Sequence, residues 1–139
     1  MKGIADTGFV VAFLNRRDSH HRWSVQLAQA VSEPLITCEA VLAEAAFHLG
    51  SVPHVLALID AGLLAVNFDF HSSYKRIEEL GRKYRDRSPD LADLCLICLS
   101  ERFPNRPVVT VDGDFRIYRR HQRERIPIVV PPEMQKSGG

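Results

Sequence analysis

The sequence predicts a single α/β domain with a mostly parallel central sheet of four to five strands and helices on both faces. Three observations predict it. Short apolar, strand-like runs alternate with longer helix-like segments, and the connections are long enough for crossovers between parallel strands. The 139 residues are enough for one domain with a hydrophobic core. We expect the domain to span residues 1–132 and a polar tail to span residues 133–139.

The first half of the chain predicts a strand, a tight turn at Asp6-Thr7-Gly8, and then alternating helices and strands. Thr37 is the expected N-cap of one helix, and Gly50 is expected to end it. Trp23 and Phe47 are expected in the core. The expected strands are residues 3–5, 34–37 and 63–68, and the expected helices begin near residue 9 and cover residues 20–31, 39–49 and 52–61.

In the second half, a charged helix over residues 72–87 precedes a nearly all-apolar helix that continues to Leu99. Ser88 is the expected N-cap of the apolar helix, with Pro89 at its first position. A buried strand at 108–111, an arginine-rich segment and a last strand at 127–130 complete the pattern.

Composition excludes several classes of protein. The formal net charge is +1, so a nucleic-acid partner would have to bind a local basic patch. Three cysteines do not form a disulfide framework, and Cys95 and Cys98 lie inside the apolar helix, where buried thiols are expected. No apolar run approaches the roughly 18 residues that suggest a membrane span. We expect a soluble, cytoplasmic protein without a membrane partner.

Four acids stand beside apolar residues on four different elements: Asp6, Glu44, Asp93 and Asp112. A carboxylate such as Asp93 inside an apolar helix is costly unless a cation meets it. It is either paired from elsewhere in the fold or holds a metal ion. Strand ends of a parallel sheet meet at one edge, and oxygen ligands without matching His or Cys favour Mg²⁺ or Mn²⁺. Such a site suits phosphodiester hydrolysis.

Each acid taken alone has a simpler interpretation, because Asp is common in turns and at helix N-caps. Asp90, three residues before Asp93, fits a cap, and Asp114 fits a turn. The joint pattern, above all Glu44 and Asp93 within apolar stripes, favours a metal site.

The chain resembles PIN domains, and among them the VapC-type toxins of toxin–antitoxin pairs. The resemblance covers roughly residues 3–130 and rests on four ordered motifs rather than on any one of them. These motifs are Ile4-Ala5-Asp6-Thr7-Gly8, Val41-Leu42-Ala43-Glu44-Ala45, Asp90-Leu91-Ala92-Asp93-Leu94 and Val109-Thr110-Val111-Asp112-Gly113-Asp114-Phe115.

The resemblance implies a Mg²⁺- or Mn²⁺-dependent endoribonuclease with Asp6, Glu44, Asp93 and Asp112 as metal-binding, catalytic acids. Asp90 and Asp114 are secondary candidates, and Thr110 and Thr7 are expected to support the acids. Leu94-Cys95 departs from the small residue common after the third acid, without removing a ligand. The implied partners are an RNA substrate, a cognate antitoxin and a second copy in a homodimer. Residues 52–61 are the expected protein-contact surface.

An arginine-rich segment directly follows the fourth acid. Between Arg116 and Arg125, five arginines and one glutamate give a local charge of 5 − 1 = +4. Arg116, Arg119 and Arg120 are therefore candidate RNA contacts, because arginine binds phosphate well; a solvated face or an antitoxin contact would explain the same charge. Weaker candidates of the same kind lie in the loop after the first strand: Arg16, Arg17, His20 and His21.

Four other functions share features with this sequence. A phosphorylatable receiver module would need adjacent acids after its first strand and a lysine after its last. Here the acids come partly from helices, and the final strand is followed by Pro131-Pro132 with no lysine until Lys136. An aspartic protease would need an all-β frame around Asp6-Thr7-Gly8. A PIN-like module that binds RNA or protein without cutting, and a housekeeping RNA-processing nuclease, stay open as alternatives.

Overall fold

The computed structural model describes residues 1–135. A short 3-10 turn, η3 (Pro132–Met134), lies where the polar tail was expected to begin, and residues 136–139 of that tail lie outside the described residues.

The central sheet is parallel and five-stranded, as predicted. Its order is β3-β2-β1-β4-β7, and every neighbouring pair runs parallel. Ile4 in the central strand pairs with Ile36 on one side and Val108 on the other. The strands are β1 (Ile4–Ala5), β2 (Leu35–Thr37), β3 (Leu64–Val66), β4 (Val108–Val109) and β7 (Ile128–Val129).

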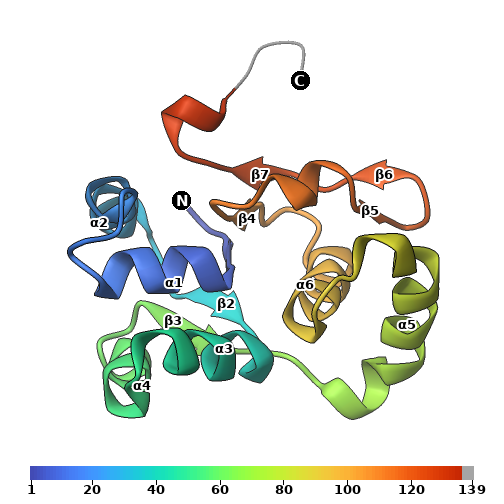
Figure 1. The fold of residues 1–139 in the computed structure, drawn as a ribbon, viewed down its shortest axis with the longest axis horizontal. Helices are drawn as coiled ribbons and strands as arrows, with labels where there is room; N and C mark the ends of the chain where they lie inside the picture. The colour runs from blue at the N-terminus through green and yellow to red at the C-terminus, as the bar shows by residue number, and fades with distance from the viewer. Residues whose placement is uncertain (136–139) are drawn as a thin grey trace.

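Six α-helices connect and cover these strands (Figure 1). In that view α5 and α6 pack together at the right, apart from α1, α2 and α4 at the left. The helices are α1 (Thr7–Leu14), α2 (His21–Ala30), α3 (Glu39–Leu49), α4 (Val52–Asp60), α5 (Phe70–Lys83) and α6 (Leu91–Arg102). Two 3-10 turns, η1 (Arg85–Arg87) and η2 (Gly113–Arg116), precede and follow α6 in the chain.

The strands are added first on one side of β1 and then on the other. The connections through α1–α2 and α3–α4 lead from β1 outward to β2 and β3, whereas α5–α6 lead back to β4 on the other side of β1. Right-handed crossovers therefore place the two groups of helices on opposite faces. Ligands in such sheets bind at the carboxyl ends of the strands where the order reverses, which here are β1 and β4.

Helix α6 is the most buried of the α-helices. Every residue from 92 to 100 is buried, because the helix is apolar around its whole circumference rather than along one stripe. Its two cysteines are buried free thiols, as expected, and Cys38 is a third. Trp23 is half-buried and stacks edge-on against Phe9 with ring centroids 6.2 Å apart. Phe47, predicted in the core, is 83% exposed on α3.

Two predicted helix caps are wrong, and both errors have a local cause. Thr37 donates its hydroxyl to the Ala5 carbonyl across the sheet at 2.9 Å, so Cys38 takes the N-cap position of α3. Ser88 lies in the left-handed region at φ 47°, and Asp90 caps α6 instead. The Asp90 Oδ1 accepts the Asp93 N–H at 2.8 Å, the bond an N-cap side chain makes.

The arginine-rich segment is folded rather than open. It forms an antiparallel hairpin of β5 (Arg119–Arg120) and β6 (Glu124–Arg125), which the sequence pattern did not predict. The Arg120 guanidinium is buried and donates to the Ser100 carbonyl and hydroxyl, both at 2.9 Å, and to Glu124. This burial and these hydrogen bonds give Arg120 a role in the fold, and its contact with RNA stays a prediction.

No helix between residues 1 and 135 combines the length and the apolar character that crossing a bilayer requires.

The first turn of α1 packs closely against the segment after β4. A Cβ added to Gly8 would collide with the Val111 Cγ2, whereas one added to Gly113 would meet nothing within 4 Å. We expect Gly8→Ala to lower the free energy of unfolding by roughly 1 kcal/mol or more, because overpacking outweighs the better helix propensity of alanine. Urea denaturation measures this, with Gly113→Ala as the control; equal stability of the two variants would contradict the close packing.

Candidate active site

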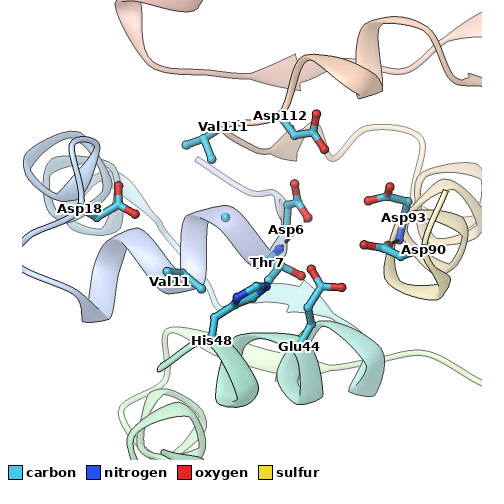
Figure 2. A pocket seen from close by; sticks show the side chains of 11 residues that line it. Asp6, Thr7, Val11, Asp18, Glu44, His48, Asp90, Asp93, Val111 and Asp112 are labelled. Atoms are coloured by element: carbon cyan, nitrogen blue, oxygen red, sulfur yellow. Dashed lines mark hydrogen bonds between the residues drawn. The ribbon is translucent and has the colours of Figure 1, made fainter. Parts of the chain in front are cut away.

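An acidic hollow of about 440 Å³ lies at the carboxyl ends of β1 and β4. Figure 2 shows Asp6, Glu44, Asp90, Asp93 and Asp112 directed toward one space, with Asp18 standing apart on the other side. Besides these six acids, the lining residues are Thr7, Gly8, Val11, His48 and Val111. Among the described residues that line it, none is a lysine or arginine.

Asp6 lies deepest because it follows directly on the central strand. It is the N-cap of α1, and its Oδ1 accepts the Thr7 N–H at 2.6 Å. Its Oδ2 accepts the Thr110 hydroxyl at 2.5 Å. Burial raises the pKa of Asp6 to about 7, despite these two hydrogen bonds.

Thr110 also links Asp6 to the fourth acid. Its Oγ1 accepts the Asp112 N–H at 2.8 Å, so one hydroxyl fixes both the end of β4 and the Asp6 carboxylate. Asp112 in turn accepts the Asp114 N–H on its Oδ1 at 2.9 Å and caps η2. Burial first, and then the charge of Asp114, raise the pKa of Asp112.

The N-terminus of α6 supplies the acids on the facing wall. Asp90 is the cap, and Asp93 is buried one turn into the helix. The Tyr118 hydroxyl donates to Asp93 Oδ2 at 3.2 Å, and Tyr118 itself is fully buried. Burial and the neighbouring carboxylates, Asp90 foremost, raise the pKa of Asp93 well above its usual range.

Helix α3 contributes the remaining predicted acid, Glu44. Glu44 is half-buried, and its pKa is raised by burial and by the nearby Asp90 carboxyl. His48, one turn further along α3, also faces the hollow. His48 was not among the predicted site residues, although its i+4 spacing from Glu44 places both on one helix face.

The residues present fit a divalent cation. Oxygen atoms of Asp93, Asp112 and Asp114 lie within 4.8 Å of one another, so each can offer a ligand to one ion. The Thr7 side chain also lines the hollow and adds a hydroxyl oxygen beside Glu44. Four acids with raised pKa values and no lining Lys or Arg indicate a site adapted to a bound cation.

The structure brings most of the predicted site residues together. Asp6, Glu44, Asp90, Asp93, Asp112 and Thr7 line the hollow, Thr110 lies behind Asp6, and Asp114 joins the Asp93–Asp112 cluster. Arg116 and Arg119 line no part of the hollow. Tyr118 and Asp18 were missed: no spacing in the sequence links Tyr118 to Asp93, because a turn of η2 brings the ring back onto α6.

Removal of the Thr110 hydroxyl should weaken metal binding while leaving every carboxylate in place. We expect Thr110→Val to lower Mn²⁺ affinity by roughly 10- to 100-fold, the usual cost of losing a group that orients a metal ligand. Thr110→Ser keeps the hydroxyl and is the control, expected to bind close to wild type. Calorimetric titration with Mn²⁺ measures both; wild-type affinity in Thr110→Val would show that the hydrogen bond to Asp6 does not orient the site.

The fold and this acid set define a class of protein. The family model described as PIN domain matches residues 4–120, so the chain belongs to the PIN domain family. No curated protein matches the chain.

Among solved structures, the chain is similar to the crystal structure of Mycobacterium tuberculosis VapC20, described as a sarcin-ricin loop cleaving toxin. The TM-score is 0.68 at 18% sequence identity, and the match covers 82% of this chain and 92% of that one. At this identity the similarity establishes the shared fold.

Proposed function

We propose that this protein is a Mg²⁺- or Mn²⁺-dependent endoribonuclease that hydrolyses RNA phosphodiester bonds. The observation that carries the proposal is the convergence of Asp6, Glu44, Asp93 and Asp112 from four elements on one hollow without a lining Lys or Arg. Six lining carboxyls would repel a phosphodiester, so a cation has to mediate the encounter. Membership of the PIN domain family supports a nuclease.

The residues divide into three roles. Asp6, Asp93 and Asp112, with Asp114 beside them, would hold the ion or ions. When bound, such an ion stabilises charge on the phosphoryl oxygens and makes water a better nucleophile. Thr110 and Tyr118 orient Asp6 and Asp93 through their hydroxyls. Glu44 is assigned to receive the proton lost by the attacking water, because it lines the hollow from α3 and is not part of the Asp93–Asp112–Asp114 cluster that can hold an ion.

The similarity to VapC20 supports a narrower proposal, that the protein is the toxin of a toxin–antitoxin pair. Its partners would be RNA, an antitoxin and a second copy of the chain. Helix α4, within residues 52–61 where we expected a protein-contact surface, exposes Val52, Leu56 and Ile59 at spacings of four and three residues. Together with the exposed Phe47, this face supports contact with another protein.

A panel of RNAs tests the enzymatic proposal. Purified protein is incubated with a sarcin-ricin loop hairpin, tRNAs and an unstructured RNA, each with Mg²⁺, Mn²⁺ or EDTA. We expect cleavage of at least one RNA that requires the metal and disappears with EDTA. Cleavage that persists in EDTA would reject the metal mechanism. Absence of cleavage across the panel, together with Mn²⁺ binding, would favour the alternative of a PIN-like module that binds without cutting.

A further inference from the structure

A second hollow, of about 510 Å³, adjoins the acidic one. His48 lines both, so the two meet at this side chain. The remaining lining comes from the end of α1, the end of α3 and the start of α4: Leu14, Asn15, Leu49, Gly50, Ser51 and His54. None of these described lining residues is acidic, whereas six acids line the first hollow.

The polar groups of this second hollow are held in place. Gly50 ends α3 in the left-handed region at φ 68°, and the chain turns there into α4. Ser51 caps α4, and its Oγ lies 2.5 Å from His54 Nδ1. Whichever atom donates, Nδ1 is engaged and Nε2 is the ring nitrogen that remains for a ligand. Across the hollow, Asn15 Oδ1 accepts the Arg17 N–H at 3.0 Å, which fixes its amide.

We propose that this second hollow, bounded by Leu14, Asn15, His48 and His54, binds a nucleotide of single-stranded RNA adjacent to the bond that is cut. The inference rests on the proposed nuclease function and adds the location of the strand. Leu14 and Leu49 offer apolar surface to a base, whereas Asn15 and His54 offer hydrogen-bond partners to its edge. Arg16 and Arg17, both exposed directly after Asn15, can neutralise the phosphates of the same strand.

The opposite route, over the arginine-rich hairpin, is less suited to RNA. Arg120 is buried, Arg116 donates to the Met134 carbonyl, and Arg119 Nη1 donates to three backbone carbonyls between residues 116 and 118. Three of the five arginines in that segment therefore stabilise local structure. Arg123 and Arg125 are the exposed arginines left on the hairpin, and they serve as the competing arm of the test.

Binding without cleavage tests the inference. The Asp6→Asn variant provides a non-cutting background, and wild-type protein in EDTA provides a second one. Fluorescence anisotropy with a labelled single-stranded oligoribonucleotide of roughly eight nucleotides gives the Kd. We expect His54→Ala and Asn15→Ala each to raise the Kd by roughly three- to tenfold, the effect of one lost hydrogen bond. His71→Ala, an exposed histidine on α5, is the matched control and should not change it.

The outcomes separate the inference from the proposed function. Hydrolysis of the small diester bis(p-nitrophenyl) phosphate with Mn²⁺ needs the acidic hollow alone, so it reports on the proposed nuclease site separately from RNA binding in the second hollow. If the wild-type protein hydrolyses neither the diester nor RNA, the proposed nuclease function fails. Unchanged RNA binding in His54→Ala and Asn15→Ala, weaker binding confined to Arg123→Ala or Arg125→Ala, or no RNA binding at all would each overturn the inference.

Discussion

Asp6→Asn should abolish metal-dependent RNA cleavage, with kcat/KM falling by roughly a thousandfold or more. Asp6 lies at the end of the central strand, and both of its oxygens are already fixed, by the Thr7 N–H and the Thr110 hydroxyl. Asparagine keeps the shape but removes the negative charge that attracts a cation. Single-turnover cleavage of the RNA identified by the panel measures the loss.

Asp18→Asn is the matched control for this prediction. Asp18 lines the same hollow but stands away from the other acids, and its Oδ1 accepts the His20 N–H at 2.8 Å, a bond that asparagine can also accept. We expect this variant to cleave at close to the wild-type rate. Equal losses in Asp6→Asn and Asp18→Asn would mean that the hollow responds to total charge, and the assignment of Asp6 as a metal ligand would fail.

The metal-free protein should lose stability as the pH rises from about 4 to about 8. Burial raises the pKa of Asp6 to about 7 and that of Asp93 above its usual range, so the folded protein holds protons that the unfolded chain has released. Each carboxyl with a raised pKa therefore lowers the free energy of unfolding as the pH increases from its pKa in the unfolded chain to its pKa in the folded protein. For Asp6 the largest loss in the free energy of unfolding is on the order of 4 kcal/mol.

A divalent cation should reverse this dependence, because it binds the ionised carboxylates. We expect Mn²⁺ to raise the Tm more at about pH 8 than at about pH 5, where protons compete for the same oxygens. Without metal at the higher pH, Asp6→Asn should be more stable than wild type, although it is inactive. Differential scanning calorimetry across this range measures all three effects. A flat Tm in the metal-free protein, or the same Mn²⁺ effect at both pH values, would contradict the burial argument.

The sequence was sufficient to predict the fold and the four acids that the structure brings to one hollow, because the positions of these acids follow from strand ends and helical periodicity. Asp6 and Asp112 follow buried strands, and parallel strands bring their ends to one edge. Glu44 and Asp93 interrupt apolar helical stripes, and both face the hollow. These are local patterns whose three-dimensional consequence depends on helix and strand geometry alone.

What the sequence could not predict depended on contacts between distant segments. Ser88 has the residue type of a cap, but Asp90 occupies that position because η1 ends at Ser88 in a left-handed turn. The charge of Arg120 suggested phosphate binding, but the β5–β6 hairpin turns its guanidinium onto Ser100. Phe47 is apolar and yet exposed, because the buried face of α3 is formed by Val41 and Ala45.

The hydrogen bond between Thr110 and Asp6 has a consequence for the synthesis of this protein. It joins residues 104 positions apart, and β4 must insert beside β1 before it can form. A chain emerging from a ribosome therefore carries Asp6 and Glu44 long before it carries a complete site. The acidic hollow, and with it the proposed nuclease site, is therefore complete only after the chain has been synthesised beyond β4.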